Sequence, residues 1–318
     1  MTKHVKVSIA LASYNGHRYL KEQIQSILNQ TYHNIELIIS DDHSCDGTQD
    51  LISKFVNSDT RVSLIVNNDR RGFVNNFENA ISHCSGEFIA LADQDDIWEL
   101  DKIDKLVRGI GAFSLIHSDA SLINMSGNCI FNSYTLTAKK NILNLDVVDV
   151  ILNNPVTGCT TMFHHSLLDK ALPFPEKLAV HDKWLALLAL LDQGIVYYDE
   201  PLVKYRQHDG NQIGAAIKSK SLIVKYKKLR LNKERIIHNE KYQYELIKTL
   251  INNQEKSLSI SMLKELNLLK IYYENIINKK FPVIAFIIRC FLFTRFEKGK
   301  SFKVKIIALF SIFKRIFC

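Results

Sequence analysis

Cysteine is sparse in this sequence, and its spacing excludes the protein classes that depend on it. The 318 residues include six cysteines, no two closer than 28 positions, so there is no CxxC pair, zinc ribbon or dense disulfide framework. Only 12 glycines and 5 prolines accompany a hydrophobic share of 47%, which excludes collagen-like and disordered chains. The composition is typical of one large or two smaller globular domains in a reducing compartment.

Long hydrophobic runs are missing as well. The first 12 residues contain an apolar run of six without a cleavage-site pattern after it, so we expect no secretory signal. The apolar stretches over residues 281–293 and 306–313 are shorter than the ~20 residues that cross a bilayer. We therefore expect a cytoplasmic protein.

Acidic residues are few in the last third of the chain. Residues 1–214 carry 18 basic and 26 acidic side chains, whereas residues 215–318 carry 23 basic and 7 acidic ones. The acidic first part argues against a nucleic acid partner. We expect one domain over residues 1–214 and a basic α-helical extension over residues 215–318, peripheral on the cytoplasmic face of the inner membrane. The alternative is that the extension packs on the first domain or on another copy.

Short apolar strands alternate with amphipathic helices in the first hundred residues. The predicted strands cover residues 6–11, 35–40, 62–66 and 88–92, and the predicted helices cover residues 19–30, 48–56 and 73–83. This alternation predicts an α/β fold, a mostly parallel sheet flanked by helices. Ligands of such sheets bind beyond the carboxyl ends of the strands.

The pattern is looser after residue 109. It predicts strands over residues 112–117, 160–163 and 195–198, a helix over residues 183–191, polar loops over residues 124–132 and 205–211, and long helices from about residue 216.

Polar and acidic residues follow three of the early strands. They are SYNG at 13–16, DDHSCDGT at 41–48 and DQDD at 93–96. Two acidic clusters at one edge of a sheet repel each other unless a cation or a hydrogen-bond donor offsets them. We therefore interpret this edge as a functional site.

The DQDD segment is the candidate metal site. Asp93 and Asp95 can hold one Mg²⁺ or Mn²⁺ and leave positions for phosphate oxygens, although this spacing alone is a weak signal. Asp96, with Glu99 three residues later, is interpreted first as the capped start of a helix over residues 97–107.

Further side chains are candidates for holding a nucleotide. The pair Asp41 and Asp42 either begins a turn or accepts the imide N–H of uracil or thymine, and Tyr14 either flanks the base or packs. Arg71 and Arg206 are candidates for phosphate or base contacts and His208 for a phosphate or a metal, with surface positions as the alternative.

Asp182 has two interpretations, and the sequence favours neither over the other. It precedes the predicted helix over residues 183–191 and is a good N-cap residue. The alternative is a general base, for which positioning beside a hydroxyl is sufficient.

Together these motifs resemble the family 2 glycosyltransferases of the GT-A fold. The resemblance covers about residues 5–214 and is carried by SIALASYNG at 8–16, LIISDDHSCDGT at 37–48 and GEFIALADQDDIW at 86–98. With YRQH at 205–208, the DQDDIW segment is similar to a rhamnosyltransferase-like bacterial branch that acts on cell-surface polysaccharides such as O-antigen or capsule.

The resemblance implies an inverting, metal-dependent transfer from a nucleotide-diphosphate sugar to a saccharide or lipid-linked saccharide. Uracil and thymine offer the same imide donor, so the donor is dTDP-rhamnose or a UDP-sugar. The implied roles are Asp42 for the pyrimidine, Asp95 for Mg²⁺ or Mn²⁺, Asp93 for its partner near the sugar or ribose, and Asp182 for the general base. Two positions differ from the family's usual pattern. Ala12 occupies a position, proposed to contact ribose or base, where the family usually has Pro or Thr. His181 occupies the position before the general base, where the family commonly has Glu.

Two other functions compete with this one. A sugar nucleotidyltransferase usually grips a triphosphate with a glycine-rich basic loop, but residues 11–16 contain one glycine and no lysine. An inactive membrane-bound scaffold of the same fold would be expected to lose Asp42, Asp95 or Asp182, and all three are present.

Overall fold

Two compact units make up the chain. The computed structural model describes residues 5–67, 72–138, 142, 145–208, 239–254 and 257–278. Unit 1 comprises Met1–Asp146 and Asn153–Ile217, and unit 2 comprises Val147–Leu152 and Lys218–Cys318.

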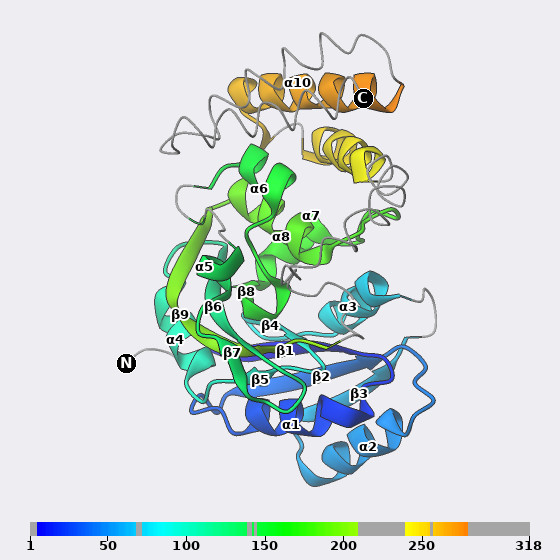
Figure 1. The fold of residues 1–318 in the computed structure, drawn as a ribbon, viewed down its shortest axis with the longest axis vertical. Helices are drawn as coiled ribbons and strands as arrows, with labels where there is room; N and C mark the ends of the chain where they lie inside the picture. The colour runs from blue at the N-terminus through cyan, green and yellow to red at the C-terminus, as the bar shows by residue number, and fades with distance from the viewer. Residues whose placement is uncertain are drawn as a thin grey trace, which may run out of the picture. The chain divides into compact units, whose positions relative to one another are not determined.

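A mixed β-sheet forms the centre of unit 1 (Figure 1). Its strands are β1 (Val7–Ser13), β2 (Ile35–Asp41), β3 (Val62–Val66), β4 (Phe88–Asp93), β5 (Ile97–Trp98), β6 (Leu115–Ile123), β7 (Cys129–Phe131), β8 (Thr161–His164) and β9 (Ile195–Arg206). Hydrogen-bonded neighbours follow the order β3-β2-β1-β4-β8-β6-β9-β5, and β7 pairs with β6. The first four of these are parallel, as the sequence predicts, whereas β8, β5 and β7 pair antiparallel. The fold is therefore mixed α/β.

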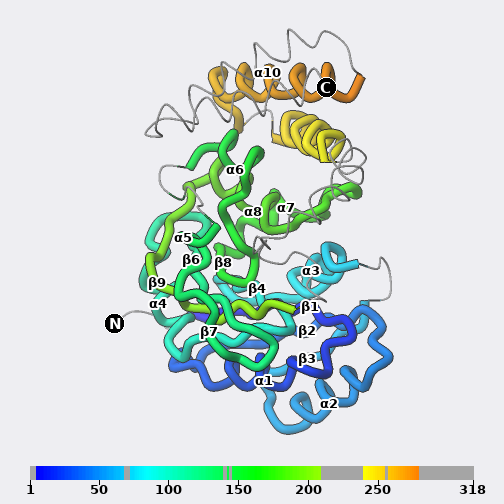
Figure 2. Tube along the Cα trace, in the orientation of Figure 1, coloured from blue at the N-terminus to red at the C-terminus, as the bar shows by residue number. Residues whose placement is uncertain are grey.

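Helices flank both faces of this sheet. In unit 1 the structure describes α1 (His17–Leu28), α2 (Thr48–Ser58), α3 (Phe73–Ser82), α4 (Lys102–Gly109), α5 (Tyr134–Ala138), α7 (Leu168–Ala171), α8 (His181–Leu190) and the 3₁₀ turns η1 (Gly158–Thr160) and η2 (His165–Leu167). Figures 1 and 2 show α1 and α2 on one face of β1, β2 and β3, and α3 on the other.

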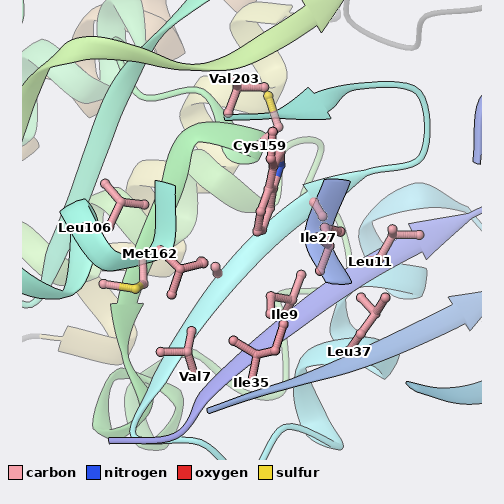
Figure 3. Close-up of a cluster of buried hydrophobic side chains, with 14 of the residues drawn as sticks. Val7, Ile9, Leu11, Ile27, Ile35, Leu37, Leu106, Cys159, Met162 and Val203 are labelled. Atoms are coloured by element: carbon pink, nitrogen blue, oxygen red, sulfur yellow. The ribbon is translucent and has the colours of Figure 1, made fainter. Parts of the chain in front are cut away.

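Alternation along the strands explains this layering. Val7, Ile9 and Leu11 of β1 point to the same face as Ile35 and Leu37 of β2, as Figure 3 shows. They form one core cluster with apolar residues of α1, α2 and α4, among them Leu20, Ile24, Ile27, Ile52, Ile103 and Leu106. Both faces of the central strands are buried, which is why their sequences are almost continuously apolar.

The prediction of a helix over residues 97–107 is wrong for the first turn. Ile97 and Trp98 pair with β9 as strand β5, and α4 begins only at Lys102, with Asp101 at the N-cap position. Asp96 therefore does not cap this helix. The pairing that extends these residues comes from Val203 and Lys204, which are too distant in sequence for a local pattern to reveal.

Strand ends also differ from the predicted ones. The strand predicted over residues 112–117 is β6, which continues to Ile123, and the predicted loop over residues 124–132 contains β7. Strand β9 runs through Arg206, so Tyr205 and Arg206 belong to the sheet and not to a polar loop.

Unit 2 is helical where the structure describes it. It contains most of α6 (Val147–Asn153), a helix over residues 239–254, and α10 (Ile260–Ile277), which begins with the Ser259 hydroxyl accepting the Met262 N–H at 3.2 Å. Among the described residues, no helix combines the length and apolar character needed to cross a bilayer. The basic and apolar stretches over residues 281–293 and 306–313 lie outside the described residues.

Candidate active site

The carboxyl ends of β1, β2 and β4 lie side by side. In the parallel ladder Ser13 pairs with Asp41, and Ala12 pairs with Asp93. The loops that follow these strands therefore begin at one edge of the sheet, as the sequence predicts for a ligand site.

The two adjacent aspartates after β2 have different surroundings. Asp41 is buried, and its carboxylate accepts hydrogen bonds from the N–H and hydroxyl of Ser44 and from the Gln49 amide, at 2.6–2.9 Å. It therefore holds the loop over residues 42–48. The Asp42 carboxylate accepts from the Asn67 amide at 3.1 Å and from the Gly72 N–H at 2.8 Å.

The loop after β1 places a largely exposed tyrosine at this edge. Tyr14 is 54% exposed, and its backbone is held by Gln94, whose amide accepts from the Tyr14 N–H at 2.8 Å and donates to the Tyr14 carbonyl at 3.0 Å. Ala12 lies within β1, and its side chain is half-buried.

Asp95 and His208 lie together. Nε2 of His208 is 2.7 Å from Oδ2 of Asp95, and the His208 ring lies 5.1 Å from the ring of Tyr19, centroid to centroid. Asp95 is buried and His208 is half-buried. A carboxylate oxygen and an imidazole nitrogen at one point are a donor set that suits Mn²⁺ and also accommodates Mg²⁺.

Arg206 has no free guanidinium to offer a diphosphate, contrary to the prediction. Its side chain is 2% exposed, and it donates to the Asp95 carbonyl at 2.7 Å, to the carbonyls of Asn124 and Met125, and to the Glu22 carboxylate at 2.6 Å. The backbone N–H of Arg206 also donates to Asp96 at 3.0 Å. Arg206 therefore positions the DQDD segment.

Asp93 belongs to a second group, in which it is half-buried and Asp96 and Cys159 are buried. Ligand atoms of Asp93, Asp96 and Cys159 all lie within 4.8 Å of one another. Burial, followed by the charge of Asp95, raises the pKa of Asp93 to about 7, and burial raises the pKa of Asp96 well above its ordinary value.

Lys102 is the basic member of this group. Its ammonium donates to the Cys159 carbonyl at 2.7 Å and lies 3.3 Å from the centroid of the Trp98 ring. Burial lowers the pKa of Lys102 to about 7, against the opposing effect of Cys159, Asp96 and Asp93. The charge of Lys102 therefore acts on both carboxylates of this group.

Asp182 is held in place from two sides. Its carboxylate accepts from the Asn154 amide at 2.9 Å and from the Gly158 N–H at 3.0 Å. The N-cap interpretation is wrong, because α8 begins one residue earlier, at His181, and Val180 occupies the N-cap position. Asp182 lies near enough to Asp93 for its charge to raise the Asp93 pKa.

His181 is buried and stacks on Phe77, with ring centroids 4.0 Å apart. Burial lowers its pKa to about 3. Among the described residues its two ring nitrogens have no hydrogen-bond partner.

Comparison with known proteins identifies the family. Residues 8–169 match the profile of glycosyl transferase family 2. The chain belongs to this family.

Two named glycosyltransferases are among the proteins similar to this chain. UDP-Glc:alpha-D-GlcNAc-diphosphoundecaprenol beta-1,3-glucosyltransferase WfgD of Escherichia coli is 32% identical over 193 residues, which cover 59% of this chain and 71% of that protein. The dTDP-rhamnosyl transferase RfbG of Shigella flexneri is 29% identical over 269 residues, which cover 77% of this chain and 87% of that protein. The chain is thus an enzyme of the glycosyltransferase class.

Solved structures show the same GT-A fold. Staphylococcus aureus TarS in complex with UDP-GlcNAc matches with a TM-score of 0.53 and 18% identity, over 84% of this chain and 79% of that one. A mannosyltransferase from Pyrobaculum calidifontis in complex with GDP-Man and Mn²⁺ also has a TM-score of 0.53, at 14% identity, over 98% of this chain and 80% of that one.

The sequence analysis does not identify several residues that build this candidate site. Gln94, Asn67 and Asn154 each hydrogen-bond a predicted site residue. Lys102 hydrogen-bonds the Cys159 carbonyl, in the turn whose Gly158 N–H donates to Asp182. A local signal exists only for Gln94, which lies between two candidate metal ligands. Arg71 lies outside the described residues.

Proposed function

We propose that this family 2 enzyme moves a sugar from dTDP-rhamnose or a UDP-sugar to a hydroxyl of a growing cell-surface polysaccharide or lipid-linked oligosaccharide, with inversion at the anomeric carbon. One observation carries the proposal. The strand edge next to Asp42 also carries the Asp95–His208 pair. The charge of Asp182 raises the pKa of Asp93, the last residue of β4 at the same edge.

Asp42 is the residue that reads the base. Both carboxylate oxygens accept hydrogen bonds, from Asn67 and Gly72, so the group is oriented before a nucleotide arrives. An oxygen has more than one lone-pair position and can still accept the imide N–H of uracil or thymine. Tyr14, which is 54% exposed, is the aromatic surface for the base, and Ala12 beside it is a ribose or base contact.

Asp95 and His208 are the residues that would hold Mg²⁺ or Mn²⁺, with Asp93 as a neighbouring carboxylate on the sugar side. Such an ion offsets the negative charge that gathers on the leaving diphosphate. Arg206 contributes by fixing the Asp95 carbonyl, and its own charge is neutralised by Glu22. The backbone at Asp95 is thereby held in place before the donor binds.

Asp182 is the general base. The Asn154 amide and the Gly158 N–H hold its carboxylate at a fixed orientation. During transfer the acceptor oxygen forms a bond to the anomeric carbon as its proton moves to Asp182, and the bond to the diphosphate oxygen breaks with its electron pair. A single displacement of this kind inverts the anomeric centre.

The proposal also includes a lipid-linked acceptor and association with the membrane. WfgD acts on a diphosphoundecaprenol-linked sugar, as its name states, and a Bacillus subtilis relative, TuaG, is 26% identical over 202 residues and carries a teichuronic acid biosynthesis name. We propose that residues 1–214 are the catalytic domain and that the basic residues 215–318 bring it to a lipid-linked acceptor at the cytoplasmic face of the inner membrane.

Donor turnover tests the function without knowledge of the acceptor. The purified protein is incubated with Mn²⁺ and a panel of UDP- and dTDP-sugars, and release of UDP or dTDP by slow hydrolysis is measured, with the D182N variant in parallel. The proposal predicts release from one nucleotide class in wild type and its loss in D182N. Equal release by both proteins, or none from any donor by a folded protein, would contradict it.

A further inference from the structure

Gln94 joins two loops of the site. It lies between Asp93 and Asp95, yet its side chain turns toward the loop after β1 and pairs with both polar backbone groups of Tyr14. Its amide oxygen accepts the Tyr14 N–H at 2.8 Å, and its amide nitrogen donates to the Tyr14 carbonyl at 3.0 Å. An amide side chain offers both a donor and an acceptor here, whereas glutamate only accepts and methionine does neither strongly.

Gly16 leaves room for this amide. A Cβ atom at Gly16 would overlap the Gln94 amide oxygen and would stand 2.7 Å from Cδ of Gln94. The φ of Gly16 is −99°, which any L-residue adopts, so the backbone itself does not require glycine here. A side chain at this position would instead displace the Gln94 amide.

The other side of the same loop is tied to the residues after β2. The Asn15 N–H donates to the Ser44 hydroxyl at 2.8 Å, and the Gly16 N–H donates to the Thr48 hydroxyl at 2.9 Å. The Asn15 side chain accepts from the Cys45 N–H at 2.9 Å. Residues 14–16 therefore lie between the DQDD segment and the loop that carries Asp42, and Gln94 makes the link on the DQDD side.

We propose that Gln94 is a positioning residue that sets the spacing between the nucleoside-binding loops and the metal ligands. This inference rests on the proposed function, in which Asp42 and Tyr14 hold the nucleoside and Asp95 and His208 hold the ion. A nucleoside diphosphate with its metal engages both parts at once. The affinity for a nucleoside diphosphate therefore depends on whether the distance between the nucleoside-binding loops and the metal ligands already matches its length. A nucleoside binds to the nucleoside-binding loops alone.

Nucleotide and nucleoside binding distinguish this role from a purely structural one. Affinities for UDP and dTDP with Mn²⁺ are measured by calorimetry, and those for uridine and thymidine by ligand-detected NMR, in wild type, Q94M and Q94E. For the nucleotide that wild type binds, we expect Q94M to weaken binding with Mn²⁺ roughly tenfold, because two neutral hydrogen bonds are lost. Q94E keeps the acceptor for the Tyr14 N–H and loses only the donor to the Tyr14 carbonyl, so we expect it to weaken binding by a smaller factor. Affinity for the matching nucleoside is expected to stay at the wild-type value.

A third variant removes the same contact without changing Gln94. G16A must displace the Gln94 amide from Tyr14, so it is expected to reproduce the loss seen in Q94M, and the double variant G16A/Q94M is expected to be no weaker than Q94M alone. Q25M, at an exposed glutamine of α1, is the matched control and is expected to bind as wild type does.

The outcomes separate this inference from the function on which it rests. If wild type binds nucleotide with Mn²⁺ and the Gln94 variants bind it equally well, the positioning role is wrong and the proposed function stands. If the variants lose nucleoside and nucleotide affinity by the same factor, Gln94 only maintains the Tyr14 loop, and the inference is again overturned. A folded wild type that binds no nucleotide overturns both.

Discussion

Nε2 of His208 lies 2.7 Å from Oδ2 of Asp95, although 113 positions separate the two residues in the chain. The end of β9 brings His208 to the loop after β4, so the fold itself assembles the pair.

This pair predicts how the metal response depends on Asp95. In D95N the neutral amide no longer holds a divalent cation well, so nucleotide affinity should be the same in Mn²⁺ and in EDTA. H208Q should lower the Mn²⁺-dependent part of the affinity roughly tenfold. Calorimetric titration measures both, with D50N on the exposed face of α2 as the control. A D95N protein that kept the full Mn²⁺ response would refute the assignment.

Arg206 is predicted to act on stability. R206M leaves the Asp95 carbonyl and the Glu22 carboxylate without their donor, so the free energy of unfolding should fall by about 3 kcal/mol. Glu22 is largely exposed but neutralises the buried Arg206, so E22Q should lower the free energy of unfolding by less than R206M does. Urea unfolding compares the two variants. Weaker nucleotide binding by R206M at unchanged stability would instead support a direct diphosphate contact.

Asp182 should separate binding from turnover. D182N keeps the shape of the side chain but cannot take a proton, so donor turnover should fall roughly 100- to 10,000-fold. Nucleotide affinity should remain close to the wild-type value, because Asp182 is proposed to act on the acceptor hydroxyl and not on the nucleotide. Steady-state release of nucleoside diphosphate and calorimetry provide the two measurements, with D169N, at an exposed position of α7, as the control. Unchanged turnover would remove Asp182 from the mechanism.

His181 should make the protein sensitive to acid. The unfolded chain binds a proton on this histidine below about pH 6.5, but burial lowers the folded-state pKa to about 3. The free energy of unfolding should therefore decrease as the pH falls through that window. H181F keeps an aromatic ring against Phe77 and should lose less stability between neutral and acidic pH. Urea unfolding across this range, with H33Q at an exposed position as the control, measures the effect. Parallel curves for wild type and H181F would contradict it.

The sequence predicts well those parts of the site that depend on local pattern. Strands β1 to β4 alternate with helices at regular spacing, and this alternation is enough to place the acidic clusters at their ends along one edge of a sheet. The choice of Asp42 and Asp95 as candidates follows from this placement together with the family resemblance.

Roles that depend on distant pairing are not predictable in the same way. The sequence leaves Arg206 available for phosphate, because its partners Asp96 and Glu22 are 110 and 184 positions away. Ile97 and Trp98 resemble the start of a helix, and only the pairing with β9 makes them a strand. Likewise, the Lys102 ammonium donates to the Cys159 carbonyl, which is 57 positions away and which no local pattern indicates as its partner.

The central claim is that this glycosyltransferase binds a pyrimidine nucleoside diphosphate through Asp42 and a divalent cation. Calorimetric titration of UDP and of dTDP into the purified protein, with Mn²⁺ and again with EDTA, tests it most directly. The account predicts that at least one of the two nucleotides binds, that EDTA weakens this binding, and that D42A abolishes it. If a folded wild-type protein bound neither nucleotide, or if D42A bound as wild type does, the account of the site would be contradicted.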